Sequence, residues 1–491
     1  MFIFFLYLVK FNIFLFLLTI DIKTFSMKTK HYLLMLLCTI ANGTLPSTSF
    51  AQSIAAGASH TLVVCDYQVQ VWGFNLYGQF GNGTNTDSYL PTSVPLLTNV
   101  ISLDGGSNFS LFLKNDGTVW ASGGNIFGQL GDGTNTDSNI PVQVSSLTNA
   151  IAIAAGWEHS IALKNDSTVW TWGNNGYGQL GNGSNTDSNV PVQVVGLSGI
   201  RAIGKGRHHS LAVKSDGTVW IWGWNGNGQL GDGTLIDSNV PLQVASLTNV
   251  KAVAGGDGHS YALKNDGTIW ASGLNAHGQL GDGTNNWSTT FVQVINLSGV
   301  NAIASGRLHG MALKNDSTVW TWGINSYGQL GNGNTNNSNT PLQVPITDVI
   351  KIAVGGEHSI ALKNTGTLWS WGLNGNGQLG NGTGLNQFET PIQTTGLSCL
   401  STATPEEVNA IVETTIYPNP FSEETIIKTN TSLTDATLSL YNLLGEKVKT
   451  IAAITGNNII LKKGNLPNGI YVIQLLENSK IITTKKLIIS N

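Results

Sequence analysis

The sequence predicts an all-β protein, a seven-bladed β-propeller followed by a small immunoglobulin-like β-sandwich. A unit of about fifty residues occurs seven times, which is close to the period of one propeller blade. Within each unit, apolar and polar residues alternate with the two-residue period of β-strands, and the 3.6-residue period of helices is absent. After residue 416, short alternating segments separated by Asn/Gly turns predict the sandwich.

Each unit is expected to form about four short strands. In the segment TVWIWG, alternation places Trp220 and Trp222 on one face of a strand, and the preceding KSDGT supplies a hairpin turn. Eleven of the fourteen tryptophans fall in these two columns. Because a blade cannot bury both of its faces alone, we expect the tryptophans to hold neighbouring blades together.

The segment WGNNGYGQLGNG, residues 172–183, has near-copies in all seven units. The first glycine of each copy recurs at a spacing of fifty residues five times and then forty-nine, at Gly73, Gly123, Gly173, Gly223, Gly273, Gly323 and Gly372. We interpret the segment as a long loop in which glycine permits positive φ. Asn175 and Gln179 are expected to hydrogen-bond the loop backbone. A phosphate-binding loop is excluded, because no Walker lysine and no helix follow.

The array is predicted to close into a ring. It begins mid-unit with SIAAGASH (Ser53 to His60) and ends with the strand that this first unit lacks, in TPIQTTGLSCL (Thr390 to Leu400). We therefore expect the last strand to complete the first blade. Aligning the units brings Cys65 and Cys399 near one another and predicts a disulfide, worth ~4–5 kcal/mol because the loop that it closes is so long. Two unrelated buried thiols are the alternative.

Residues 1–51 are interpreted as an N-terminal extension and a signal peptide. A basic stretch after Met27, the apolar run YLLMLLCTIA and small residues before Gln52 form a secretory signal. We expect translation to start at Met27 and cleavage to follow Ala51, so that Gln52 opens a mature chain without a membrane span. The alternative is that the apolar residues 1–20, which are long enough to cross a bilayer, form an anchor that starts at Met1.

Composition argues against nucleic-acid binding. Only 11% of the residues are charged, and the segment 52–404 carries 12 basic against 19 acidic residues, a balance of −7. Proteins that bind nucleic acids normally present a basic surface. The sequence contains no G-x-S-x-G, H-E-x-x-H or C-x-x-C signature, so we expect no catalytic site and no cofactor.

The elements GxxHS, ALKNDGTVWTWGxNxxGQLGNG and PVQV recur in this order in the units. Over residues 52–401 the chain therefore resembles the regulator of chromosome condensation repeat superfamily. The resemblance implies a seven-bladed propeller in which the two ends share one blade. Members of the superfamily include an exchange factor for a small GTPase and a plant ultraviolet photoreceptor, but a shared fold transfers neither function.

The motifs IYPNPF, LYNLLGEKV and LPNGIYVIQL lie within residues 416–491. They resemble the type A C-terminal sorting domain of type IX secretion in Bacteroidetes, through Tyr417, Pro418, Asn419, Pro420, Leu466, Pro467, Asn468, Gly469 and Tyr471. The resemblance implies that the type IX secretion machinery is a partner, and that the protein is secreted or displayed at the outer-membrane surface. Residues 402–415 are interpreted as a linker.

One histidine per unit recurs at the same strand position, except where Phe109 replaces it: His60, His159, His209, His259, His309 and His358. Histidines placed one per blade around a ring are too far apart to share a metal ion, so we interpret them as packing or turn-bonding residues. The segment GDGTNTDS (Gly131 to Ser138) is reminiscent of a calcium loop but lacks its acidic pattern, which favours a turn. We expect no metal site.

The two residues before the histidine column differ in every unit, whereas the scaffold positions are alike. The loops that carry them lie on one face of the predicted ring, and such diversification on a rigid scaffold is typical of a recognition surface. The candidate binding residues are Trp157, Glu158, Arg207, His208, Asp257, Arg307 and Glu357. Neutral drift in exposed turns is the alternative.

These observations predict an exported, non-enzymatic propeller that binds a protein or glycan partner at the cell surface or outside the cell. The first alternative is a hydrolase or lyase that acts on polysaccharides, with a carboxylate such as Glu158 or Glu357. The second is a guanine-nucleotide exchange factor, which is disfavoured because an exported chain does not meet a cytosolic GTPase.

Overall fold

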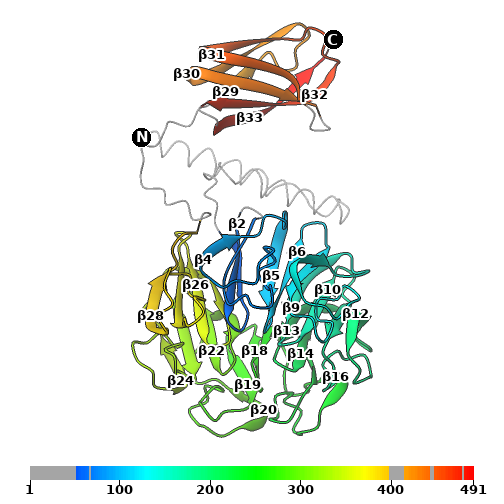
Figure 1. Cartoon of the computed structure of the whole chain (residues 1–491), viewed down its shortest axis with the longest axis vertical. Helices are drawn as coiled ribbons and strands as arrows, with labels where there is room; N and C mark the ends of the chain where they lie inside the picture. The colour runs from blue at the N-terminus through cyan, green and yellow to red at the C-terminus, as the bar shows by residue number, and fades with distance from the viewer. Residues whose placement is uncertain (1–50, 66–67, 398–413, 443–446, 478–479, 491) are drawn as a thin grey trace, which may run out of the picture. The chain divides into compact units, whose positions relative to one another are not determined.

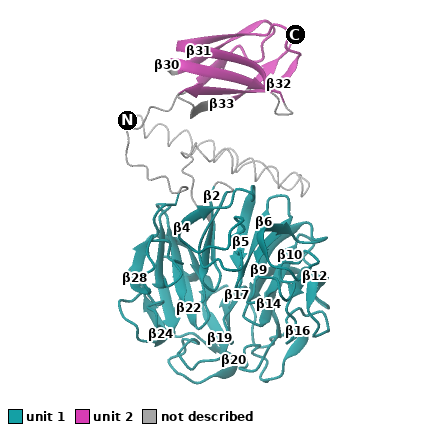
Figure 2. Cartoon of the chain, in the orientation of Figure 1, with its two compact units in different colours: residues 1–401 teal, residues 402–491 magenta. Residues whose placement is uncertain are grey.

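The computed structural model describes residues 51–65, 68–397, 414–442, 447–477 and 480–490. The chain divides into two compact units, Met1–Ser401 and Thr402–Asn491, which Figure 2 shows in teal and magenta. All regular structure within the described residues is β-strand. The predicted start at Met27 lies outside these residues, and the predicted cleavage after Ala51 falls after the first residue of strand β1 (Ala51–Ala56). Both stay predictions.

The first unit contains seven antiparallel sheets of four strands each, which are the predicted seven blades and are numbered 1 to 7 along the chain, from β1–β4 to β25–β28 (Figure 1). The inner strands are β1, β5 (Val100–Gly105), β9 (Ala150–Ala155), β13 (Ile200–Lys205), β17 (Val250–Gly255), β21 (Val300–Ser305) and β25 (Val349–Val354). The second strands are β2 (His60–Cys65), β6 (Phe109–Lys114), β10 (His159–Lys164), β14 (His209–Lys214), β18 (His259–Lys264), β22 (His309–Lys314) and β26 (His358–Lys363). The third strands are β3 (Gln68–Gly73), β7 (Val119–Gly123), β11 (Val169–Gly173), β15 (Val219–Gly223), β19 (Ile269–Gly273), β23 (Val319–Gly323) and β27 (Leu368–Leu373). The outer strands are β4 (Ser88–Ser93), β8 (Ser138–Gln143), β12 (Ser188–Gln193), β16 (Ser238–Gln243), β20 (Ser288–Gln293), β24 (Ser338–Gln343) and β28 (Gln387–Gln393).

The strand sequences explain both the hairpins and the cohesion between blades. In blade 4, Asp216 Oδ1 accepts hydrogen bonds from the backbone N–H and the hydroxyl of Thr218, which fixes the predicted turn between β14 and β15. Trp222 is fully buried in a cluster with residues of blade 3, and its indole N–H donates to the Gln179 carbonyl at 2.9 Å. Trp220 is half-buried beneath Lys214, whose Nζ lies 4.4 Å from the ring centroid. The tryptophan columns thus hold blades together, as predicted.

The expectation that the last strand completes the first blade is wrong. β28 pairs with β27, and blade 1 already contains four consecutive strands, so every blade is continuous in sequence. The PxQV strand of each unit pairs with the strand before it, as the partners Trp220 and Gln243 show. The two strands are antiparallel neighbours joined by the glycine-rich loop, so the pairing stays local. The unit expected from the sequence is therefore displaced by one strand from the structural blade.

Contacts between blades 7 and 1 close the ring. His358 Nε2 and Thr61 Oγ1 lie 3.0 Å apart, and the Gly356 N–H donates to the Ala58 carbonyl at 3.1 Å. In Figure 1 the yellow strands of blade 7 stand beside the blue strands of blade 1. The predicted closed ring is confirmed, but it closes without a shared blade. Cys65 is disulfide-bonded; Cys399 lies outside the described residues, so the predicted pairing of the two stays a prediction.

The glycine-rich loops, which connect the third and fourth strands, are called CD loops below. Gly173, Gly178, Gly181 and Gly183 all have positive φ, as predicted. Asn175 is fully buried, donates through Nδ2 to the Ser184 and Thr186 carbonyls, and accepts from the Leu180 N–H. The loop backbone is therefore fixed from within by one amide side chain, which explains why the motif is repeated in every blade.

Substitutions at two glycines of one CD loop allow the cost of a strained backbone to be measured separately from the cost of a close contact with the next blade. Replacing Gly183, with φ +82° and open space around its Cα, by Ala is expected to cost ~1–2 kcal/mol for the left-handed conformation alone. Gly178 has φ +80°, but a Cβ there would lie 2.5 Å from Asn239 Cα of the next blade. Gly178→Ala should therefore cost a further ~1–3 kcal/mol. Urea denaturation of both variants measures the difference in their free energy of unfolding. Equal losses of stability would contradict the expectation, because the added Cβ at residue 178 would then fit against the next blade without cost.

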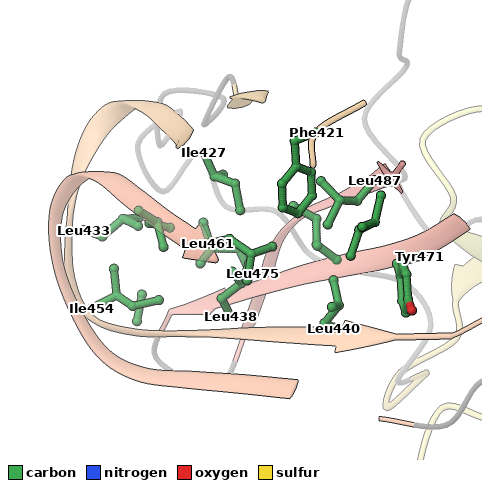
Figure 3. Close-up of a cluster of buried hydrophobic side chains, with 14 residues drawn as sticks. Phe421, Ile427, Leu433, Leu438, Leu440, Ile454, Leu461, Tyr471, Leu475 and Leu487 are labelled. Carbon is green, nitrogen blue, oxygen red and sulfur yellow. The ribbon is translucent and has the colours of Figure 1, made fainter. Parts of the chain in front are cut away.

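The second unit has five strands, β29 (Thr414–Tyr417), β30 (Glu424–Tyr441), β31 (Lys447–Lys462), β32 (Gly469–Glu477) and β33 (Lys480–Ile489). They form one antiparallel sheet in which β30 pairs with β29, β31 and β32, rather than two separate sheets. The pairing of β30 with β31 shifts in register near Asp435 and Ala453, which have positive φ. Figure 3 shows the two long strands curving there around a buried apolar cluster that includes Leu433, Leu438 and Ile454. One bent sheet thus supplies both layers around the core.

The sorting motifs hold the ends of this unit together. The Asn419 carboxamide accepts from the Ile488 N–H of β33 at 2.8 Å, and the Thr425 hydroxyl donates to the Pro418 carbonyl. The Tyr471 hydroxyl donates to the Pro467 carbonyl at 2.8 Å. The remaining motif residues lie in the same two segments: Tyr417 is 81% exposed, Pro420 precedes the buried Phe421, Leu466 packs against the core, Asn468 accepts from a lysine, and Gly469 starts β32.

Candidate binding face

The histidine column forms a belt of hydrogen bonds between blades. Each histidine is fully buried, and its Nε2 lies 2.9–3.1 Å from a hydroxyl of the following blade, in the pairs His60–Ser110, His159–Ser210, His209–Ser260, His259–Ser305, His309–Ser359 and His358–Thr61. In the pair His209–Ser260, the Ser260 hydroxyl donates its single hydrogen to the Gln229 carbonyl, so Nε2 must be the donor. Nδ1 then carries a lone pair, and among the described residues it has no hydrogen-bond partner.

The hydrogen bonds give the belt a structural role, in agreement with the interpretation of these histidines as packing or turn-bonding residues. Burial lowers the pKa of five of these histidines to about 3 and that of His309 to about 4, so all six are neutral near pH 7. Each ring is directed at a neighbouring blade and not at another histidine. Within the residues that the structure describes, no cluster of three His, Cys, Asp or Glu side chains is arranged to hold a metal ion.

The loop between the first and second strands of each blade, called the AB loop, carries the candidate binding residues. The first candidate position of each AB loop donates its backbone N–H to a carbonyl of the AB loop in the next blade, and seven such bonds close a circle around the channel. The pairs Arg207 N to Gly256 O and Asp257 N to Arg307 O, both 2.9 Å, are typical of them. The side chains at this position therefore project from a rigid backbone ring.

Five of the seven candidate residues form a continuous chain of contacts across blades 3 to 7. The Arg207 guanidinium lies over Trp157, 4.6 Å from the ring centroid, and its Nη1 lies 3.2 Å from an Asp257 oxygen. The same oxygen accepts from Arg307 Nε at 2.9 Å, and Arg307 Nη1 reaches Glu357 at 3.2 Å. Arg207, Arg307 and Glu357 keep 25–42% of their side-chain surface exposed. We call this chain the charged arc.

The two remaining candidates flank Arg207. Arg207 Nε donates to His208 Nε2 at 3.1 Å, so the His208 proton lies on Nδ1. Burial, and then the charge of Arg207, lower the pKa of His208 to about 4, so the ring is neutral near pH 7. Burial raises the pKa of the half-buried Glu158 carboxyl, against the opposing effect of Arg207. The structure therefore brings all seven predicted residues to one face, with Trp157, Glu158 and His208 gathered around Arg207.

The inner strands line a central channel that contains two cavities. One cavity of about 60 Å³ opens among the AB loops and touches Trp157, Arg207, Asp257 and Arg307 of the charged arc. The other, of about 250 Å³, is lined by aliphatic side chains of the inner strands and by Asp104. Lys205 borders both cavities.

Lys205 and Asp104 form an ion pair that the sequence analysis missed. Lys205 Nζ donates to Asp104 Oδ1 at 2.7 Å and to the Gly105 carbonyl at 2.8 Å, which joins blade 4 to blade 2 across blade 3. Asp104 also accepts from the Ala155 N–H of blade 3. The sequence did contain one indication of this pair, because the other six units carry Ala or Gly at the position of Asp104.

Tyr177 and Trp224 are also exposed or partly exposed residues of this face that the sequence analysis passed over. Both lie in CD loops and pack around His208, with ring centroids 5.2 Å and 6.2 Å from the imidazole. Only Trp224 carried a signal in the sequence, because no other unit has tryptophan at this position; tyrosine at the Tyr177 position also occurs in blades 1 and 6. By contrast, the turn aspartates of the segment Gly131 to Ser138 accept hydrogen bonds within their own loop: Asp132 from Thr134 and Asp137 from Asn125.

Seven four-stranded blades, a rigid ring of diversified loops and a second β-unit with sorting motifs define a β-propeller carrying a secretion domain. The chain belongs to the RCC1-like domain family, whose model matches residues 150–411. Models of the regulator of chromosome condensation (RCC1) repeat match residues 68–113 and 116–163, and a further one matches residues 100–129. The secretion system C-terminal sorting domain matches residues 415–490. The protein is therefore secreted or located at the cell surface through type IX secretion.

Solved structures agree on the fold. Prp20p from Saccharomyces cerevisiae, studied for its binding to Gsp1p and histones, is 22% identical with a TM-score of 0.61, over 71% of this chain and 88% of its own. Human WBSCR16 is 26% identical with a TM-score of 0.61, over 67% of this chain and 94% of its own. No curated protein matches the sequence. Among the described residues, no helix is long and apolar enough to cross a membrane.

Proposed function

We propose that the propeller is a non-enzymatic binding protein that recognises a protein or glycan partner outside the cell through its AB-loop face. The observation that carries this proposal is the charged arc, in which Trp157, Arg207, Asp257, Arg307 and Glu357 connect five blades through contacts of side chains that the sequence repeat does not require. Tryptophan and arginine are the side chains that most often dominate binding energies.

The arc is suited to recognition because its side chains are held in place before a partner arrives. Asp257 is mostly buried and accepts from two arginines, so one carboxylate holds both guanidinium groups. Hydrogen bonds to Asp257, ahead of the charges of Asp257 and Glu357, raise the pKa of Arg307. Fixing long side chains in advance lowers the entropic cost of association. Exposed edges of Arg207, Arg307 and Glu357 remain available for contact.

Substitution within the arc tests the proposal. Trp157→Ala and Arg207→Ala are each expected to weaken partner capture by the secreted protein by about tenfold or more. Lys214→Ala is the matched control, because Lys214 also covers a tryptophan of blade 4 but lies at the opposite end of β14. The partner is identified by mass spectrometry of the captured material, and its affinity is then measured with each variant. Unchanged affinity in both arc variants would exclude this face.

An assay of polysaccharide cleavage distinguishes the binding proposal from the enzyme alternative. In the proposed binding role, Glu357 is committed to Arg307, and Glu158 lies on a different blade. A panel of polysaccharides should therefore be left intact by the secreted protein. Cleavage that is lost in Glu158→Gln or Glu357→Gln would replace the binding proposal with a hydrolase or lyase. An exchange-factor role is disfavoured because the chain is exported.

A further inference from the structure

We propose that Tyr177, His208 and Trp224, together called the aromatic cluster, form a saccharide-binding site. The inference deepens the proposed function and rests on it, because His208 belongs to the AB loops of the same face. It commits to one of the two partner classes that the charged arc alone leaves open.

The cluster is built from three loops of two adjacent blades. The ring centroids of Tyr177 and His208 lie 5.2 Å apart, those of Tyr177 and Trp224 lie 6.0 Å apart, and those of His208 and Trp224 lie 6.2 Å apart. The rings are inclined to one another by 45°, 49° and 83°, so they enclose a corner and do not stack into a closed block. Tyr177 keeps 41% of its surface exposed.

A glycine allows one ring of the cluster to lie against the backbone of its own loop. Trp224 lies close to Gly226, where an added Cβ would stand 2.7 Å from the indole Nε1. Gly176 precedes Tyr177 in the corresponding loop of blade 3, whereas blades 1 and 2 carry the exposed Leu76 and Ile126 at this position. Gly226 thus admits the indole of Trp224 to the cluster, and Gly176 leaves Tyr177 without the exposed aliphatic neighbour that blades 1 and 2 carry.

Polar side chains occupy the same loops as the rings or adjoining ones. Arg207 donates to His208 and lies over Trp157, and the Glu158 carboxylate stands at the adjoining loop position. In the loop of Tyr177, Asn174 Oδ1 accepts from Gln179 Nε2 at 2.6 Å, which orients a carboxamide at the surface. Arginine donates, carboxylate accepts and carboxamide does both, which matches the donor and acceptor capacity of sugar hydroxyls.

The chemistry of this cluster favours a saccharide over a protein partner. A pyranose ring presents an apolar C–H face and a rim of hydroxyls, which complement an aromatic corner bordered by these polar groups. A stable protein interface requires a contiguous area of roughly 800 Å² on each partner. Three rings in a corner form a smaller site with one apolar centre, as expected for the recognition of a few sugar units.

A printed array of neutral and uronic-acid oligosaccharides, probed with the secreted full-length protein, tests the proposal. We expect binding to a restricted set of saccharides, with Tyr177→Ala and Trp224→Ala each lowering the affinity about tenfold. Tyr327→Ala is the matched control, because Tyr327 occupies the same repeat position in blade 6 at 38% exposure but makes no ring contact within the described residues. It should bind as the unchanged protein does.

The outcomes separate this inference from the proposed function. An array without binding, together with a captured protein whose affinity falls in Trp157→Ala, would overturn the saccharide site and retain the binding face. Saccharide binding that survives Tyr177→Ala and Trp224→Ala would also overturn the site, since the sugar then binds elsewhere. Circular dichroism and urea denaturation of each variant confirm that the propeller is folded, so that lost binding reports on the cluster.

Discussion

Lowering the pH from 7 to 5 is expected to destabilise the propeller strongly. Six buried histidines have a folded-state pKa of about 3 to 4, against about 6.5 in the unfolded chain. Below pH 6.5 these histidines bind protons in the unfolded chain but stay neutral in the folded ring, so the free energy of unfolding falls as the pH falls. Each histidine contributes up to ~1.4 kcal/mol per pH unit, and the belt of six at most about 8 kcal/mol per pH unit, a limit that is reached well below pH 6.5.

The loss is comparable to a typical stability of ~5–15 kcal/mol, so the propeller should have lost a large part of its stability by pH 5. The exposed turn aspartates do not mimic this effect, because hydrogen bonds from Thr118 and its equivalents lower the pKa of groups such as Asp116, which therefore titrate only at more acidic pH. Urea denaturation between pH 7.5 and 5 measures the number of protons taken up on unfolding. A stability that does not change over this range would contradict the role assigned to the belt.

Blade 2 supplies the control. Phe109 occupies the histidine position there and is fully buried, and the hydroxyl that follows it, Ser160, keeps its bond to the Gln129 carbonyl at 2.8 Å. His309→Phe should reproduce this arrangement, since Ser359 still donates to the Gln329 carbonyl. The variant is expected to fold and to take up one proton fewer on unfolding.

Trp222→Ala is expected to destabilise the propeller by ~3–5 kcal/mol, because a fully buried indole is lost and the surrounding strands close the cavity only in part. Trp222→Ser should cost nearly as much, although a serine restores the hydrogen bond. Ser272, at this position in blade 5, donates to the Gln229 carbonyl at 3.2 Å, as the indole of Trp222 does to Gln179. The comparison separates lost volume from a lost hydrogen bond, and thermal or urea unfolding measures both variants.

Blade 5 also shows how another side chain can fill the volume of a missing tryptophan. Phe291 is buried beside Gly231 of blade 4. The equivalent glycine of blade 3, Gly181, contacts the indole of Trp222 instead. In blade 4, Pro241 occupies the position of Phe291. The double variant Trp222→Ser with Pro241→Phe should therefore recover part of the stability that Trp222→Ser loses. No recovery would mean that Phe291 does not replace the missing tryptophan.

The sequence was sufficient to predict features that repeat. Seven blades, the Asp216-type hairpins, the positive-φ glycines and the buried loop amide of Asn175 all follow from columns of identical residues. Which four consecutive strands form one blade was not predictable in the same way, because a periodic sequence has no marker for where one unit ends. Only the pairing of Gln243 with Trp220 decides that the PxQV strand belongs to the preceding blade.

The features that depend on single departures from the repeat were harder to predict. Trp157, Arg207, Asp257, Arg307 and Glu357 were selected for their variability, but their alternating order of charge acquires meaning only when consecutive loops are adjacent. Lys205 and Asp104 lie about a hundred residues apart, and only the curvature of the ring brings their side chains to within 2.7 Å. Their pairing is a property of the closed ring and of no single unit.

Strand pairing confined to each unit has a consequence for how such a chain can change. The gene could be circularly permuted at any connection between an outer strand and the next inner strand, for example before Val250, and would still encode seven intact sheets. In-frame gain or loss of one repeat by recombination likewise leaves no orphaned strand. The join between the first and last blades differs from the others only because the chain enters and leaves the propeller there, and its architecture is the same.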